Sequence, residues 1–251
     1  CTNIHLSANR VIHNGGGGIG GSKRLTALLE DNVTSYNNWR GSMCGFYTWA
    51  IGGVKFGFGA RDVIFRRHQS LHNDTAGIFM DWDNERVLYD ECVFVDSIRY
   101  GANLEASIGP ITLSNSVLWR NRGIGVHCHG SRNVSMHGCT LAGNVVQFNQ
   151  FSGDRTIQPW DGGPSYQDVA KDWTVRNTLF ASEDRESWTS NTSEFVSDWT
   201  NPRPPKPMAW QPLFNYKNTG TWETFIETLD ANSNLYFHPT RTDVFYRADG
   251  D

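Results

Sequence analysis

A repeat of about two dozen residues constrains the fold of this chain more than any other feature of its sequence. Each copy has two apolar residues separated by one position, then a second apolar run and a residue that is most often Asn. Copies begin at Ile4, Ala27, Val63, Val87, Ile111, Val134 and Trp173. The distances between successive starts are 23, 36, 24, 24, 23 and 39 residues. Such periods are typical of solenoids, so the sequence predicts stacked coils with two insertions.

The repeats have the composition of β-strands. They are rich in Val, Ile, Phe, Tyr and Trp, and helical periodicity is scarce. We therefore predict an all-β chain, a parallel β-helix of about seven or more coils over residues 1–183, with insertions at about 39–56 and 148–170. Residues 184–251 are expected to be irregular extended chain packed on the solenoid, with one more coil strand at 233–237.

A column of asparagines recurs at the tenth position after each repeat start. Its members are Asn14, Asn37, Asn73, Ser97, Asn121 and Asn144. Amides in register can form hydrogen bonds from coil to coil at a tight corner, where Asn also tolerates left-handed backbone angles. We predict a structural role for this column.

The overall charge excludes two classes of partner. The net charge is −4 and there are no basic runs, which argues against nucleic acid and anionic membrane surfaces. No apolar stretch reaches the roughly 20 residues of a membrane span. We expect a secreted, periplasmic or cell-surface protein. Neither end reads as a cap, so we expect the chain to be a segment of a larger protein, or a further chain or domain to cover the solenoid ends.

Three segments share a frame of Gly, three residues and an ionisable group. They run from Gly77 to Asp81, from Gly101 to Glu105 and from Gly123 to His127, and they start 24 and 22 residues apart. This spacing predicts that the three ionisable residues lie side by side on successive coils. Strand alternation adds further outward residues to the same face, namely Phe79, Asp83, Asn103 and His129.

Two stacked carboxylates suit one kind of chemistry. Asp81 and Glu105 on adjacent coils are expected to lie on the order of 5 Å apart, the separation that retaining glycosidases use. Like charges at this distance raise one pKa and give one protonated acid beside one ionised nucleophile. The alternative is that both are ordinary solvated groups at the rim of the solenoid.

The same region resembles the active-site segment of right-handed β-helix glycosidases, in particular the β-xylosidases of glycoside hydrolase family 120. The matching motifs are Gly77-Ile-Phe-Met-Asp81-Trp82, with Phe79 and Met80 in place of Trp and Leu, and Leu104-Glu105-Ala-Ser-Ile-Gly109-Pro110. The similarity covers residues 60–145, about a third of the chain. It implies a right-handed helix, Asp81 as the nucleophile, Glu105 as the general acid/base, and a xyloside or related glycan as substrate.

The insertions are expected to supply the walls of the pocket. The first holds Trp39, Arg40, Trp49 and Lys55, which suit sugar stacking and hydroxyl recognition. We expect Lys55 to neighbour Asp81 and help to keep it ionised. The second insertion holds Asp154, Arg155 and Trp160 as a further wall.

Two other functions stay open. A polysaccharide lyase would use a cation such as Ca²⁺ held by the acidic and histidine residues of the outward face, with Lys55 nearby as base. A non-catalytic solenoid for carbohydrate binding or adhesion would use the carboxylates only as rim groups. The glycosidase hypothesis needs no cofactor and no metal.

Overall fold

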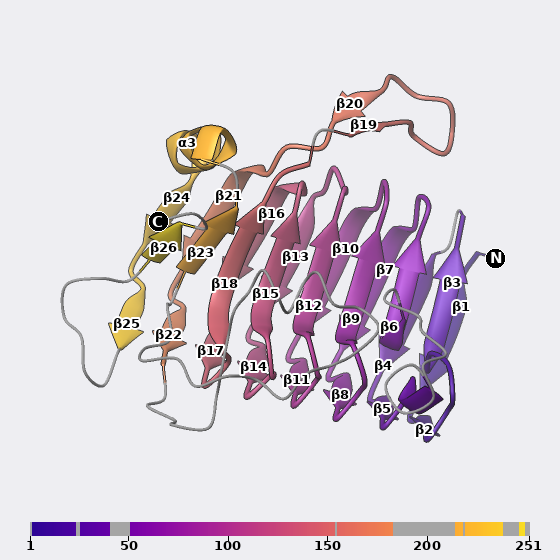
Figure 1. The fold of residues 1–251 in the computed structure, drawn as a ribbon. Helices are drawn as coiled ribbons and strands as arrows, with labels where there is room; N and C mark the ends of the chain where they lie inside the picture. Colours follow the sequence, from indigo (N-terminus) through magenta and orange to yellow (C-terminus); the bar gives the residue numbers. More distant parts are fainter. Residues whose placement is uncertain are drawn as a thin grey trace.

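The computed structural model describes residues 2–23, 26–40, 51–153, 155–182, 214–217, 219–237 and 246–248. In this part of the chain the strands form three parallel sheets that wind into a β-helix (Figure 1). Each sheet has eight strands, one from each coil. The prediction of an all-β parallel β-helix of seven or more coils is confirmed.

The first sheet contains β1 (Ile4–Ser7), β4 (Ala27–Glu30), β7 (Arg61–Arg66), β10 (Glu85–Asp90), β13 (Ile111–Ser114), β16 (Arg132–His137), β21 (Lys171–Arg176) and β24 (Asp230–Asn232). The second contains β2 (Arg10–Ile12), β5 (Val33–Ser35), β8 (Gln69–Leu71), β11 (Val93–Val95), β14 (Val117–Trp119), β17 (Thr140–Ala142), β22 (Leu179–Ala181) and β25 (Leu235–Phe237). The third contains β3 (Ile19–Ser22), β6 (Gly52–Gly57), β9 (Ala76–Asp81), β12 (Tyr100–Glu105), β15 (Ile124–His129), β18 (Val146–Phe151), β23 (Phe214–Lys217) and β26 (Tyr246–Ala248).

The predicted repeat frame is the register of the first sheet. Every repeat start is the Cα partner of the next, from Ile4 with Ala27 through to Val134 with Trp173. The two long steps keep this register because their extra residues leave the coil between strands. A one-residue slip would turn every inward side chain outward, so the apolar pattern fixes the pairing.

The core is a set of stacked apolar rows inside the coils. One row of Cα partners on the first sheet is almost wholly excluded from solvent: Leu29, Phe65, Tyr89, Leu113, Met136 and Val175. The rings of Phe65 and Tyr89 stack with centroids 4.8 Å apart. Burying each such side chain stabilises the fold by about 1.5–3 kcal/mol.

The asparagine column forms the predicted amide ladder. Asn14 donates to Asn37 at 2.8 Å, Asn37 to Asn73 at 3.0 Å, and Asn121 to Asn144 at 2.9 Å. The left-handed backbone angle falls on the residue before each corner position, for example φ 54° at Tyr36 and 53° at His72. The ladder satisfies amides that are buried at the corner and would otherwise be costly.

The insertions and the C-terminal region differ from the predicted boundaries. Gly52–Gly57 is the coil strand β6, so the first insertion ends earlier than 56, and β18 likewise belongs to a coil. The second insertion contains a small antiparallel pair, β19 (Thr156–Ile157) and β20 (Tyr166–Gln167), which projects from the coils (Figure 1). The predicted strand near 233–237 is β25.

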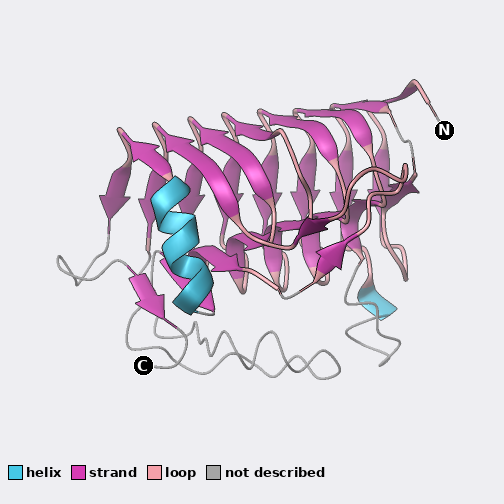
Figure 2. Cartoon of the chain, turned by 90° about the horizontal axis from the view of Figure 1, so that it is seen from above, coloured by secondary structure: helices cyan, strands magenta, loops and turns pink. Residues whose placement is uncertain are grey.

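A helix that the sequence pattern did not predict closes part of the last coils. Helix α3 (Thr219–Thr228) lies across the strands near the C-terminal end (Figure 2). Its Phe225 is 1% exposed and contacts the rings of Phe148 and Trp173. In the described segments, no helix is long and apolar enough to cross a membrane.

Candidate functional site

A column of glycines brings the coils of the third sheet close together. In each of three neighbouring strands a glycine separates a residue of a small outer apolar cluster from a residue of the main core. The residues of the outer cluster are Ala76, Tyr100 and Ile124. Those of the main core are Ile78, Ala102 and Val126. These glycines are Gly77, Gly101 and Gly125. A Cβ at each of these glycines would lie 2.6–2.7 Å from a carbonyl oxygen of the next coil. Glycine is required because the neighbouring backbone leaves no room for a side chain.

Asp81 and Glu105 are Cα partners at the ends of β9 and β12, as predicted. Adjacent strands lie about 4.8 Å apart, and both side chains point to the outward face. Asp81 is 8% exposed and Glu105 is 6% exposed. Lys55 Nζ lies 2.8 Å from Asp81 Oδ2, which confirms the predicted contact between these residues. The Lys55 ammonium also lies over the Phe79 ring, 4.3 Å from its centroid.

Glu105 is held from the other side by the second insertion. Arg155 Nη1 donates to Glu105 Oε1 at 2.7 Å, and its Nε donates to Asp168 Oδ2 at 2.6 Å. Arg155 Nη2 lies 3.0 Å from His129 Nε2, so this ring nitrogen accepts and the ring proton lies on Nδ1. His129 Nδ1 lies 3.5 Å from Glu105 Oε2. The result is a compact ionic network of two carboxylates around one guanidinium.

The two paired carboxyl groups have opposite pKa shifts. Burial, and then the charge of Glu105, raise the pKa of Asp81, and Lys55 offsets only part of this. Burial also tends to raise the pKa of Glu105, but His129 and Arg155 outweigh it and lower the pKa to about 2. Glu105 is therefore the more acidic member of the pair in the free protein. Burial raises the pKa of Asp168 despite its contacts with His129 and Arg155.

A second outward row lies beside the carboxylates and corrects the position of one predicted residue. Lys55, Phe79, Asn103, His127 and Asn149 are successive Cα partners. His127 thus aligns with Asn103 and not with Glu105, and it is His129 that contacts Glu105. The third frame was misaligned by two residues because the glycine of the column is Gly125.

His127 is tightly packed in this row. Its ring stacks on Tyr100 with centroids 4.8 Å apart and an interplanar angle of 7°. Asn149 Nδ2 donates to Nδ1 at 2.9 Å, so the neutral ring carries its proton on Nε2. His127 is 5% exposed and Asn103 is 4% exposed.

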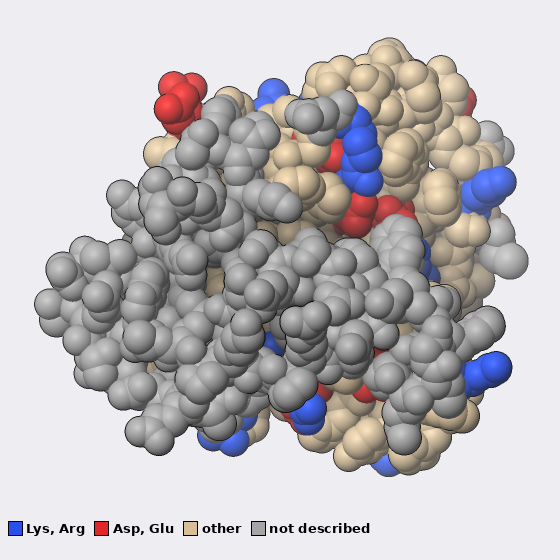
Figure 3. All heavy atoms as spheres, viewed as in Figure 1, with Lys and Arg blue, Asp and Glu red and all other residues tan. Residues whose placement is uncertain are grey.

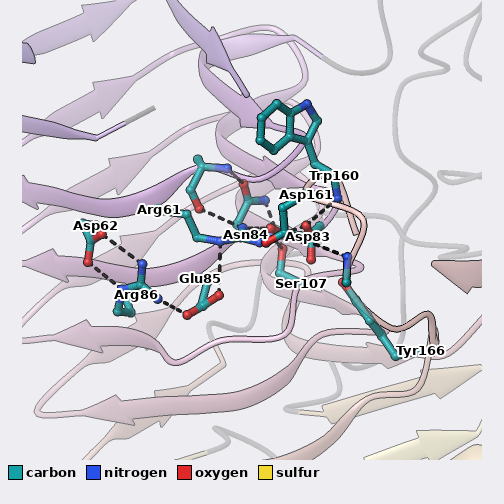
Figure 4. Close-up of polar contacts among 12 residues, drawn as sticks. Arg61, Asp62, Asp83, Asn84, Glu85, Arg86, Ser107, Trp160, Asp161 and Tyr166 are labelled. Atoms are coloured by element: carbon teal, nitrogen blue, oxygen red, sulfur yellow. Dashed lines mark hydrogen bonds and ion pairs between the residues drawn. The ribbon is translucent and has the colours of Figure 1, made fainter. Parts of the chain in front are cut away.

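Asp83 does not lie on the outward face that the sequence predicted. Strand β9 ends at Asp81, and the next two residues take left-handed angles that turn Asp83 away from the carboxylate pair. Asp83 is fully buried and accepts from Arg61 Nη2 at 2.9 Å and from the backbone N–H of Trp160 at 3.0 Å (Figure 4). Asp83 therefore anchors the second insertion instead of lying beside Asp81 on the outward face.

Two further hydrogen bonds fix the insertion that carries Arg155. Trp82 Nε1 donates to the carbonyl of Gln158 at 3.1 Å, and Tyr166 Oη donates to the carbonyl of Ala106 at 2.8 Å. On the face seen in Figure 3, acidic and basic side chains lie together below the β19–β20 segment. The insertion is therefore a wall of the site, as predicted, although Asp154 lies outside the described residues.

Two predicted residues of the first insertion, Trp39 and Arg40, lie at the edge of the described chain. Trp39 Nε1 donates to the carbonyl of His13 at 3.1 Å, and Arg40 N–H donates to Gly15 at 3.3 Å. These contacts fasten both residues to the first coil, and their predicted role in substrate binding stays a prediction. Trp49 lies outside the described residues.

Asp168 is a site residue that the sequence patterns missed, and they placed Arg155 in the second insertion without predicting its contact with Glu105. Both lie in the insertion between repeats, so no periodicity aligns them with Glu105. Among the described residues, no group of three or more His, Cys, Asp or Glu side chains is arranged to hold a metal ion. The positive charges beside Asp81 and Glu105 are the side chains of Lys55 and Arg155.

The comparisons with known proteins concern the fold. A family model described as a right-handed beta helix region matches residues 1–151. The A-module of mannuronan C-5 epimerase AlgE4 from Azotobacter vinelandii is 14% identical, with a TM-score of 0.60 over 99% of this chain and 56% of that chain. The structure of XylC with xylose is 18% identical, with a TM-score of 0.62 over 94% of this chain and 38% of that chain.

The A-module of the AlgE6 epimerase from the same organism is 13% identical, with a TM-score of 0.56 over 100% of this chain and 59% of that chain. This chain therefore spans less than two thirds of each of these structures. None of the curated proteins compared matches the chain.

Proposed function

Because this chain belongs to the right-handed β-helix family and pairs Asp81 with Glu105 on one outward face, we propose that it is a carbohydrate-active enzyme, specifically a retaining glycoside hydrolase. The expected substrate is a xyloside or a related plant or microbial glycan. XylC, which was solved with xylose, and the mannuronan epimerases share the fold and support the carbohydrate class. A polysaccharide substrate agrees with the predicted location outside the cytoplasm.

The proposal depends mainly on one observation, the pairing of two buried carboxyl groups on adjacent strands, each with its own cation. Asp81 contacts Lys55 at 2.8 Å and Glu105 contacts Arg155 at 2.7 Å. Retaining glycosidases need two carboxyl groups at this kind of spacing, one protonated and one ionised. The opposite directions of the two pKa shifts support such a division into a less acidic and a more acidic carboxyl group.

The division of roles is a separate question. The resemblance implies Asp81 as nucleophile and Glu105 as acid/base, which requires Arg155 to leave Glu105 when substrate binds so that this carboxyl can take up a proton. In the free protein the pKa shifts favour the reverse order, with Glu105 ionised and Asp81 as proton donor. Azide distinguishes the two assignments. In a variant that lacks the acid/base, azide gives a glycosyl azide of retained configuration, and in one that lacks the nucleophile it gives the inverted product.

The test is a screen of aryl glycosides against the wild type, Asp81→Ala and Glu105→Ala. We expect each variant to lose about 10²–10⁴-fold in activity, and NMR of the first product to show retention of anomeric configuration. Asp90→Ala, on the first sheet, is the control and should keep full activity. An inverted wild-type product, or unchanged activity in both variants, would refute the mechanism.

A β-eliminating lyase is the second candidate, favoured by the cations and His129 beside the carboxylates. Lys55 or Arg155 would neutralise a uronate carboxylate, and a histidine would remove the proton next to it. A lyase gives an unsaturated product that absorbs in the ultraviolet. If a cation takes part, chelators should abolish the activity. A purely binding solenoid instead predicts that Asp81→Asn keeps its affinity for glycans.

A further inference from the structure

Asn103 differs from the corner asparagines of this chain. At the corners, amides such as Asn37 and Asn121 donate and accept along the ladder. Asn103 lies in the middle of strand β12 and is 4% exposed. Its Oδ1 is enclosed and accepts no hydrogen bond from any residue that the structure describes.

An enclosed acceptor without a partner is costly. It loses its water and gains nothing in return, which costs about 1–3 kcal/mol. Such groups in native proteins call for an explanation, and a ligand that supplies the missing donor is one. Apolar residues would fill this position without the cost, as they do in the rows of the core.

The surroundings of Asn103 indicate where the donor comes from. Phe79 and His127 are its Cα partners on the two neighbouring strands. Glu105 lies two residues further along the same strand and on the same face, about 6.6 Å away along the backbone. A sugar ring with its reacting carbon at the Asp81–Glu105 pair spans this distance, so one of its hydroxyls reaches Asn103.

We propose that Asn103 Oδ1 accepts a hydrogen bond from a free hydroxyl of the sugar ring whose glycosidic bond is cleaved. This inference rests on the proposed function and defines its substrate class more closely. The substrate carries an unsubstituted hydroxyl at that ring position, and the site discriminates against glycosides in which it is absent, methylated or acylated. A binding site that leaves a buried polar group unpaired rejects such analogues.

The experiment compares an aryl glycoside with its set of monodeoxy analogues, using the wild type and Asn103→Leu. In the wild type, we expect kcat/KM for one deoxy analogue to be about 10- to 100-fold lower than for the parent glycoside, because that analogue lacks the hydrogen bond to Asn103. With the parent glycoside, the kcat/KM of Asn103→Leu should be lower than that of the wild type by a similar factor. With that deoxy analogue, Asn103→Leu and the wild type should have the same kcat/KM. Equal losses for the parent and every analogue would overturn the proposal.

Stability gives an independent readout. Asn103→Leu should leave the melting temperature unchanged or raise it, because it removes an unmet acceptor. Asn121→Leu is the matched control and should lower it, since Asn121 donates to Asn144 at 2.9 Å and to the carbonyl of Phe94 at 3.1 Å. A loss of stability in Asn103→Leu equal to that of Asn121→Leu would indicate a structural role and refute the inference.

Failure of the proposed function is distinguishable. If the wild type cleaves no glycoside, the hydrolase proposal is wrong, and calorimetric binding of the parent and deoxy sugars then tests Asn103 directly. A wild type that binds the parent at least 10-fold more tightly than one deoxy sugar, with the difference lost in Asn103→Leu, supports the role of Asn103. Equal affinities contradict it.

Discussion

Arg155 and Glu105 are 50 residues apart in the sequence, yet Arg155 Nη1 donates to Glu105 Oε1 at 2.7 Å. The contact joins a loop insertion to the end of a coil strand. It also determines the charge state of the candidate site, since Arg155 and His129 together lower the pKa of Glu105 against the effect of burial. The electrostatics of the carboxylate pair thus depend on a residue outside the repeat.

Arg155→Met should raise the pKa of Glu105. Burial already tends to raise it, and loss of a paired cation adds a shift of about 1–3 units upward. Carbon-detected NMR titration of the side-chain carboxyl measures this directly, and the limb of the pH–rate profile that reports Glu105 should move to higher pH. Arg155→Lys should shift less because the charge stays.

The control for this prediction is Arg122→Met. Arg122 is half exposed and donates to Asp96 Oδ1 at 2.9 Å, and neither residue is a partner of Asp81 or Glu105 in any contact of the described residues. Its removal should leave the titration of Glu105 unchanged. An unchanged titration in Arg155→Met as well would contradict the role given to Arg155.

Asp83→Asn should destabilise the protein by about 3 kcal/mol, because it breaks a buried ion pair and leaves Arg61 paired with Glu85 alone among the described carboxylates. The same change weakens the anchor of the insertion that holds Arg155, so kcat/KM should fall with it. Urea unfolding measures the free energy. Asp62→Asn is the control, since its exposed pair with Arg86 is worth at most about 1 kcal/mol. Equal effects of the two changes would show that burial at Asp83 is unimportant.

Gly77→Ala should cost about 1–3 kcal/mol, the range seen when a packed region is forced to accept an extra carbon. The new Cβ would lie 2.6 Å from the Gly101 carbonyl oxygen, so β9 and β12 must separate and move Asp81 relative to Glu105. Thermal unfolding and activity should therefore decline together. Gly16→Ala is the control, because nothing lies within 4 Å of a Cβ there. A Gly77→Ala variant with wild-type stability would be inconsistent with the close approach of the coils.

Because of His68, the free energy of unfolding should decrease as the pH falls below about 6.5. Its ring is fully buried in the core, with Nε2 3.2 Å from Thr34 Oγ1, and burial lowers its pKa from 6.5 to about 4. The unfolded chain binds a proton at His68 below pH 6.5, whereas the folded chain resists it until about pH 4. Stability contributed by the neutral ring is therefore lost as the pH falls through this window, by up to about 3 kcal/mol.

The measurement is the free energy of unfolding between pH 7 and pH 4 for the wild type, His68→Gln and the exposed-site control His5→Gln. The slope should be shallower in His68→Gln alone. If all three proteins show the same pH dependence, another group is responsible for the acid sensitivity.

The sequence predicted the coil architecture in detail because a solenoid is built from local information. Each repeat contributes the same strands, and its apolar alternation sets the register with the next coil, so the pairing of Val63 with Val87 and of Asp81 with Glu105 could be read from spacing. The same logic placed the asparagine ladder and brought Lys55 to Asp81. The position of His127 was predicted wrongly by two residues. Gly123 was taken as the partner of Gly101, whereas the aligned glycine is Gly125.

Only the tertiary structure decided what lies outside the period. Arg155 and Asp168 reach Glu105 and His129 from an insertion with no repeat to align it, Asp83 turns inward at a left-handed corner, and α3 joins the core through Phe225. The physical reason is that repeat spacing fixes strand register, whereas a loop finds its place by its own hydrogen bonds and ion pairs. The sequence thus determined which two carboxylates meet, and the folded insertion decided which of them is the more acidic.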